Sequence, residues 1–448
     1  MTRTYPGTAA AAMAVTMAVT MAVGAAPAQA TALTGFAVLP AETFIPGPTS
    51  GQFTGPRNGV TPPFDGLQPV QGFSSIIPGA GGRYLAMSDN GFGSKANSPD
   101  ALLYVHDLTI DFRTETGGSG TVTVNTSTPL SDPNSLITFP IVADQTFYPG
   151  GPNDIPVDAA IRDSRLLTGA DFDIESFRRD ANGNFWFGDE FGPFLFKTND
   201  SFEVIAAPIQ TPGVQSVDSP LLGGDTANLR RSRGLEGMGI SDDGLTLYPM
   251  LEGNTEGSPS DILRIFEFDV VTEGFTGTGF LYQLDAGGRA IGELSPVGGD
   301  RYLVIERDGG GEGNIFKKLF LIDLNETDAD GILEKTLVAD LLDIDDPFDL
   351  NGDGLTAFTF PFVTIESVTM LDPTTLLIAN DNNFPGGGQR IPGVPENSEF
   401  ITISLDRSLL AVTGPSPLLL MLTGFGLLGL GYRLQPAPCA HRPRSPAD

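Results

Sequence analysis

Histidine and cysteine are nearly absent from this chain. Its 448 residues include two histidines, His106 and His441, and one cysteine, Cys439. A single cysteine excludes a disulfide within the chain. So few imidazoles and thiols argue against a Ser-His-Asp or Cys-His catalytic machine, and against a His-rich zinc or transition-metal site. There is no Gly-x-Ser-x-Gly motif either, so a serine esterase finds no support.

Positive charge is also scarce. The chain has 25 Lys and Arg against 55 Asp and Glu, a formal net charge of −30. A field of this sign repels polyanions, so nucleic acid is excluded as an expected partner, and anionic membrane surfaces are disfavoured for the main domain.

Long amphipathic helices are missing as well. The sequence instead has many short runs rich in β-branched and aromatic residues, such as 101–110, 262–270 and 319–324, separated by turn sequences. The 56 glycines and 36 prolines suit many tight turns. These patterns predict an all-β fold.

Four units along the chain share a pattern of acids. In each unit an acid opens a strand-like run, a turn follows, and a second run ends on another acid. The acid-to-acid spacings are 15, 16, 13 and 15 residues. The pairs are Glu175 and Glu190, Glu236 and Glu252, Glu293 and Glu306, and Glu366 and Asp381.

Repetition of this kind predicts a β-propeller of five to seven blades, with five or six favoured. Residues 72–91 form a degenerate fifth unit, and residues 34–39 are expected to close the last blade as an N-terminal strand. A pair of β-sandwiches is the competing fold, but it does not explain acids at the same ends of strands. Around a propeller axis these carboxylates would converge.

The two ends of the chain have the composition of targeting segments. Residues 1–30 combine Arg3, an Ala/Met/Val run and Ala28-Gln29-Ala30, which is typical of an export signal peptide. Residues 411–448 contain an apolar stretch, 418–430, between a Pro-Ser-Pro motif and Arg433. This order resembles a PEP-CTERM sorting tail, although Gly-Pro-Ser-Pro replaces Pro-Glu-Pro and a Pro-rich extension follows.

The predicted organisation is therefore a signal peptide (1–30), a propeller domain (31–410) and a C-terminal sorting or anchor segment (411–448). The apolar stretch is short for a full span, which needs about 20 residues, yet it is a candidate transmembrane or surface attachment. The expected location is exported, at the cell surface or outer envelope or secreted. Ordinary buried apolar helices are the alternative for both ends.

Several motifs within residues 65–405 carry a family resemblance. They are 173–176, 186–193, 233–238, 306–308, 360–362, 365–367 and 380–385. Together they resemble the phytase-like family, described as "esterase-like activity of phytase". The resemblance implies a propeller fold and, less directly, phosphate-ester hydrolysis of the kind seen in calcium-dependent propeller phytases. It therefore also implies a small anionic or phosphorylated substrate as the partner.

Oxygen ligands without histidine or cysteine favour Ca²⁺ or Mg²⁺, and Ca²⁺ is preferred because it tolerates irregular carboxylate geometry. A separate loop, 349–354, matches the first half of an EF-hand loop, but its twelfth position is Phe360 rather than glutamate. The alternative is that the acids cap blades through backbone amides or arginines and that the loop is a solvated turn. The candidate metal ligands are Glu175, Asp189, Glu190, Glu252, Glu293, Glu306, Asp308, Asp349, Asn351, Asp353 and Asp381.

Four further residues are candidates for catalysis. Glu236 or Glu366 would act as a general base, and Arg233 and Arg307 would clamp a phosphate, because guanidinium groups match phosphate oxygens. Alternatively, both arginines pair with the neighbouring acids. Two functions therefore remain open: an exported calcium-dependent phosphoric ester hydrolase, and a non-catalytic surface propeller that binds a ligand or protein and uses its acids structurally.

Overall fold

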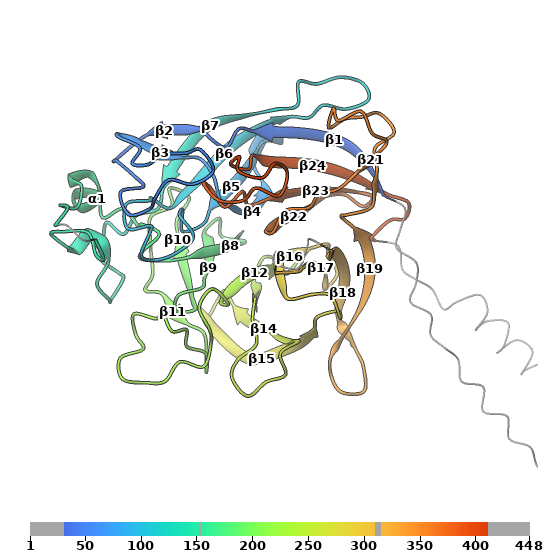
Figure 1. Cartoon of the computed structure of the whole chain (residues 1–448). Helices are drawn as coiled ribbons and strands as arrows, with labels where there is room; N and C mark the ends of the chain where they lie inside the picture. The colour runs from blue at the N-terminus through green and yellow to red at the C-terminus, as the bar shows by residue number, and fades with distance from the viewer. Residues whose placement is uncertain (1–30, 152–153, 310–314, 411–448) are drawn as a thin grey trace, which may run out of the picture.

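The computed structural model describes residues 31–151, 154–309 and 315–410, and its regular structure is almost entirely β. Within these residues, five four-stranded antiparallel units surround a common axis (Figure 1). The innermost strands contact one another in a closed ring, β4–β8–β12–β16–β22 and back to β4. The chain is therefore a β-propeller, as predicted, and the described residues show five units from the expected range of five to seven.

Each unit, here called a blade, runs from the axis outward in chain order, except that the N-terminal strand β1 is the outermost strand of blade 5. Blade 1 is β4 (Phe73–Pro78), β5 (Tyr84–Ser88), β6 (Tyr104–Asp111) and β7 (Thr121–Pro129). Blade 2 is β8 (Ile174–Arg179), β9 (Phe185–Asp189), β10 (Phe194–Thr198) and β11 (Ile209–Gln210). Blade 3 is β12 (Leu235–Ile240), β13 (Thr246–Leu251), β14 (Ile262–Asp269) and β15 (Gly274–Gln283).

Blade 4 is β16 (Ala290–Pro296), β17 (Arg301–Arg307), β18 (Lys317–Thr327) and β19 (Leu333–Asp340). Blade 5 is β22 (Ile365–Asp372), β23 (Thr375–Asn380), β24 (Ser398–Leu405) and β1 (Thr31–Leu39). The remaining short elements lie in connections: β2 (Phe44–Pro46), β3 (Leu67–Pro69), β20 (Ile344–Asp345), β21 (Ala357–Phe358), the 3₁₀ turns η1 (Ala80–Gly82) and η2 (Val142–Asp144), and α1 (Ala159–Ser164).

The N-terminal strand closes the ring. β1 pairs antiparallel with β24 along its whole length, for example Ala37 with Phe400 (Figure 1, blue beside red). A single parallel pair, Val38 with Thr121, also joins β1 to the outer strand of blade 1. The first and last blades are thus held together by strand pairing between distant parts of the chain, as the sequence predicted.

Every inner strand carries a β-bulge near its start. The pairing register between the first two strands shifts at Phe73/Ser75, Ile174/Ser176, Leu235/Gly237, Ile291/Glu293 and Ile365/Ser367. A bulge inserts one unpaired residue and re-aims its side chain. The residues at these five positions are Ser74, Glu175, Glu236, Gly292 and Glu366, so three of them are glutamates.

An ion pair fills the propeller axis beyond the bulges. Nη2 of Arg178, on β8, lies 3.0 Å from Oε1 of Glu293 on β16. The Ser75 hydroxyl, on β4, donates to Glu293 Oε2 at 2.9 Å and lies 3.1 Å from Arg178 Nη1. Glu293 is fully buried and Arg178 is 4% exposed. This group, the axial ion pair, ties three blades together across the centre.

The predicted end segments, 1–30 and 411–448, lie outside the described residues. Among the residues that are described, no helix combines the length and apolar character needed to cross a membrane.

Breaking the axial ion pair should destabilise the protein strongly. Arg178→Met leaves the Glu293 carboxylate buried without its cation, a change that costs about 3–5 kcal/mol in comparable sites. Denaturant unfolding measures the loss. The double variant Arg178→Met/Glu293→Met should regain most of it, because no uncompensated charge remains.

The matched control is Arg83→Met, which removes the exposed partner of Asp107. Exposed pairs contribute about 0–1 kcal/mol, so this variant should unfold nearly as the wild type does. Equal losses for Arg83→Met and Arg178→Met would contradict a structural role for the axial pair.

Candidate functional site

Two residues from each blade lie at the same end of the propeller axis. One is the bulge residue of the inner strand. The other is on or just after the second strand, and it follows the residue that pairs with the position just before the bulge. From blade 1 to blade 5 these pairs are Ser74 and Asp89, Glu175 and Glu190, Glu236 and Glu252, Gly292 and Arg307, and Glu366 and Asp381. We call the space they surround the acid chamber.

The chamber carboxylates are removed from water and lie close to one another. Exposed fractions are 9% for Glu175, 3% for Glu190 and Glu236, and 4% for Glu366. Burial, followed by repulsion from neighbouring carboxylates, raises the pKa of Glu175, Glu190 and Glu236 well above its ordinary range. The same causes raise the pKa of Glu366 to about 8, against a partial offset from Arg307. These groups need a cation to be charged together near neutral pH.

Arg307 supplies such a cation on one side. Its Nη2 lies 2.7 Å from Glu252 Oε1, 3.2 Å from Glu366 Oε1 and 3.3 Å from Glu236 Oε1. Burial opposes the charge of Arg307, but the three carboxylates outweigh burial and raise the pKa of its guanidinium. Arg233 adds a second guanidinium, which contacts the other oxygen of Glu252. Blades 3 and 5 therefore present acids that Arg307 compensates in part.

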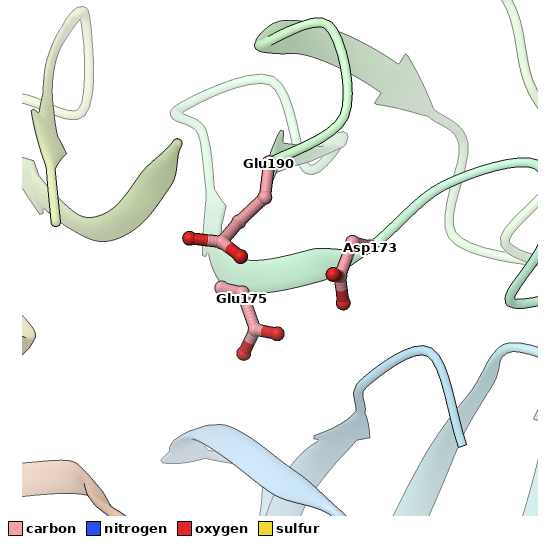
Figure 2. A group of neighbouring side chains, drawn as sticks. All are labelled: Asp173, Glu175 and Glu190. Carbon is pink, nitrogen blue, oxygen red and sulfur yellow. The ribbon is translucent and has the colours of Figure 1, made fainter. Parts of the chain in front are cut away.

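On the opposite side of the chamber, no ion pair to the acids of blade 2 is found among the described residues, although the charge of Arg233 lowers the pKa of Glu190 in part. Carboxylate oxygens of Asp173, Glu175 and Glu190 lie within 4.8 Å of one another (Figure 2). Asp173 accepts a hydrogen bond from Asn90 Nδ2 at 2.7 Å, and Glu190 from the Gly234 amide at 2.9 Å. Glu175 Oε2 is buried and accepts no hydrogen bond from the described residues. We call these three residues the candidate cation site.

A hard divalent cation fits the donors of this site. All of them are carboxylate oxygens, and an unsatisfied buried oxygen requires a donor or a metal. A second group, Glu190, Glu236 and Glu252, has oxygens within the same 4.8 Å limit. It shares Glu190 with the first group, but two of its members already contact Arg307.

Other predicted ligands do not join the chamber. Glu306 turns outward to Tyr282 Oη at 2.5 Å and to Lys335. Asp308 pairs with buried Lys317 at 2.5 Å, and despite burial this contact lowers the pKa of Asp308. Asp189 accepts the amides of Asp173 and Gly192 at 2.9 and 2.7 Å. These contacts correspond to the alternative expectation, that acids pair locally with backbone amides and basic side chains.

Glu293 differs from the other three leading glutamates because it is one residue past the bulge, in the axial ion pair. The loop 349–354, which matches the first half of an EF-hand loop, is also separate from the chamber. There Asp349 accepts the Gly354 amide at 2.9 Å, and Asn351 donates to Asp353 at 2.9 Å. Within the described residues, the loop contributes to neither of the two carboxylate groups.

Two acids at this end of the axis were not among the predicted site residues: Asp89 of the chamber, and Asp173 of the candidate cation site. Burial and repulsion from Asp381 and Asp173 raise the pKa of Asp89 well above its usual range. The spacing signal was available: 74 to 89, 175 to 190, 292 to 307 and 366 to 381 are each 15 residues. The spacing of 13 residues from Glu293 to Glu306 is shorter because each of these acids lies one residue inside the equivalent positions, 292 and 307.

A pocket adjoins the chamber mouth. It has a volume of about 250 Å³ and is lined by Asp89 of the chamber together with Arg57, Asn97, Asn383 and Gln389. Arg57 is exposed. A ligand in this pocket would meet one guanidinium and several amides on one side and the acid chamber on the other.

Comparison with known proteins gives one family. A family model described as "Phytase-like: Esterase-like activity of phytase" matches residues 68–384. The comparison with curated proteins found no match.

Solved structures with distant similarity include a luciferin-regenerating enzyme (11% identity, 76% of this chain and 81% of that chain, TM-score 0.34). Others are a GH43 β-1,3-galactosidase, BT3683 (12%, 75% and 90%, 0.38), and an exo-β-1,3-galactanase from Phanerochaete chrysosporium (10%, 84% and 64%, 0.39). Scores this low support no inference about activity.

The raised pKa of Glu366 predicts a pH dependence in chelator-treated protein. A carboxyl whose pKa rises from 4.5 to about 8 on folding binds protons more tightly when folded. Its stabilising effect is complete below pH 4.5 and is lost as the pH rises through 8. The free energy of unfolding should therefore fall over this interval, and Glu366→Gln should make the fall shallower. Exposed Glu334→Gln, on β19, is the control and should keep the wild-type slope; an unchanged slope in Glu366→Gln would refute this reading.

Proposed function

The chain belongs to the phytase-like family, and we propose that it is an exported, calcium-dependent phosphoric ester hydrolase whose reaction centre is the acid chamber. One observation carries the proposal: three buried carboxylates converge opposite the Arg307 side, and one oxygen of Glu175 has no hydrogen-bond partner among the described residues. Buried carboxyls that lie this close can be ionised together only with a counter-charge beside them.

Asp173, Glu175 and Glu190 would hold the cation. A bound Ca²⁺ supplies the positive charge that neutralises and orients a phosphate group, and it lowers the pKa of the carboxyls around it. Asn90 keeps Asp173 oriented through its 2.7 Å hydrogen bond, and the Gly234 amide does the same for Glu190.

Glu236 is the general base in this proposal. It lies between the candidate cation site and Arg307: one of its oxygens is within 4.8 Å of an oxygen of Glu190, and its Oε1 is 3.3 Å from Arg307 Nη2. It takes the proton of the attacking water as the phosphorus–oxygen ester bond breaks, and the leaving alcohol takes a proton from solvent. Both oxygens of Glu366 are engaged, by Arg307 and by the Ser74 hydroxyl, so Glu366 acts by holding Arg307 in place.

The size of the chamber limits what can enter. Its glutamates are 2–9% exposed, so it admits an ion and a small group rather than a whole organic phosphate. The body of the substrate would lie in the pocket beside Asp89, where Arg57 offers a guanidinium fork. Arg233, with a side chain 35% exposed, is the chamber guanidinium that can reach a phosphate at the mouth, whereas Arg307 is enclosed by carboxylates.

Export and surface attachment are parts of the same proposal that depend on residues 1–30 and 411–448. The signal-like first segment and the apolar stretch 418–430 support them. The partner is accordingly a phosphorylated small molecule outside the cytoplasm, where calcium is plentiful enough for a site of moderate affinity.

A non-catalytic calcium-binding propeller is the second candidate. It is favoured by the contacts of Arg233 and Arg307, since both guanidiniums already contact carboxylates. Both proposed functions include calcium binding, but only the hydrolase turns over a substrate. Phosphate release from phytate and p-nitrophenyl phosphate, with Ca²⁺ and with chelator, separates them: a calcium-loaded protein without any release is a binding protein.

Removal of the Glu175 carboxylate should abolish tight calcium binding. Wild-type protein should melt at a higher temperature with Ca²⁺ than with chelator, and Glu175→Gln should lose that difference, together with phosphate release. Asp349→Asn, in the outer loop, is the matched control and should keep both. If Asp349→Asn loses the calcium-dependent shift and Glu175→Gln keeps it, the functional ion is not in the chamber.

Arg57→Gln should weaken substrate binding without slowing the bound complex. Loss of one charge-assisted hydrogen bond of about 1.5 kcal/mol corresponds to roughly a tenfold higher KM with little change in kcat. Steady-state kinetics with a soluble phosphate monoester measures both. Arg83→Gln is the control and should behave as the wild type, because Arg83 precedes β5 whereas Asp89 of the pocket follows it. A fall in kcat alone in Arg57→Gln would show that Arg57 does not bind the substrate.

A further inference from the structure

Blade 4 breaks the pattern of the acid chamber. At the bulge position it has Gly292, where the other blades have serine or glutamate. At the second position it has Arg307, where the others have aspartate or glutamate. This one blade therefore contributes no carboxylate to the chamber and places a guanidinium there instead.

The backbone explains why no side chain stands at residue 292. A Cβ atom there would lie 2.1 Å from the carbonyl oxygen of Ile365 and 3.4 Å from Cα of Glu366. These are backbone atoms of the neighbouring inner strand, which cannot move away without opening the ring. The close approach of β16 and β22 thus excludes a fourth bulge glutamate.

Arg307 lies where a metal ion would be expected in a chamber of five acidic blades. Its Nη2 atom is 2.7–3.3 Å from one oxygen each of Glu236, Glu252 and Glu366. Two of these, Glu236 and Glu252, belong to the second carboxylate group, which would otherwise be a cation site beside the first. Three carboxylate oxygens around one cationic atom form the arrangement that a hard metal ion also takes.

We infer that Arg307 replaces a second divalent cation, so that the chamber takes one Ca²⁺, at Asp173, Glu175 and Glu190. The inference rests on the proposed calcium binding and adds the number of ions and its cause. A divalent ion at Glu190, Glu236 and Glu252 would have to displace or approach a buried guanidinium of like sign. Glu190, shared by both groups, is left for the first ion.

The experiment counts bound ions. Protein carrying Asp349→Asn and Asp353→Asn, so that the outer loop contributes none, is dialysed against Ca²⁺, and bound metal per chain is measured by elemental analysis and by titration calorimetry. This parent should bind one ion. Adding Arg307→Met, which keeps the length of the side chain but removes its charge, should raise the count to two.

Arg233→Met is the matched control. It removes the other guanidinium that contacts Glu252 but leaves Arg307 in place, so the count should stay at one. Two ions in the parent protein, or one ion in a folded Arg307→Met variant, would overturn the inference while leaving calcium binding intact. No ion in the parent would instead overturn the proposed metal dependence.

A second measurement covers the case in which Arg307→Met does not fold. Glu252→Gln removes the carboxylate that lies 2.7 Å from Arg307 but leaves the candidate cation site intact, so the parent protein with this change should retain its one ion. Glu175→Gln in the same parent should lose it. Loss of the ion in Glu252→Gln would show that the bound cation depends on the Arg307 side, which contradicts the inference.

Discussion

Repulsion between buried carboxylates is the constraint on which the centre of this propeller depends. Blades that repeat an acid at the same two positions bring those acids together around the axis, where water cannot screen them. The buried carboxylates of different blades differ in the positive charge that balances them. Arg178 pairs with Glu293 on the axis, Arg307 pairs with acids of blades 3 and 5, and the acids of blade 2 form a group that could hold an external cation.

The β-bulges convert a strand repeat into a chamber. Without the extra residue, side chains at the start of an inner strand would alternate between the two faces of the blade. The bulge turns Glu175, Glu236 and Glu366 to the same end of the axis, above the axial ion pair. The chamber therefore has a closed side formed by Arg178 and Glu293 and an open side next to the pocket of Asp89 and Arg57.

Much of this could be predicted from local sequence, and the failures have physical reasons. Strand runs, turns and the acid repeat are properties of neighbouring residues, so the propeller and the convergence of Glu175, Glu190, Glu236 and Glu366 followed from them. Glu306 and Asp308 were misplaced because their partners, Lys335 and Lys317, are on other strands of blade 4. In blade 4 the bulge residue is Gly292, so Glu293, one residue later, is not equivalent to the leading glutamates of the other blades. Asp173 lies just before β8 and is therefore outside the repeated strand pattern.

The sequence alone determined the all-β class, the repeated unit and the chemistry of the ligands, because alternation, turn residues and the shortage of histidine and cysteine are readable along the chain. Tertiary structure decided which acids are compensated and which are left for a cation. That depends on whether Arg307 or Arg178 reaches a carboxylate of another blade, and such contacts exist only once the ring has closed.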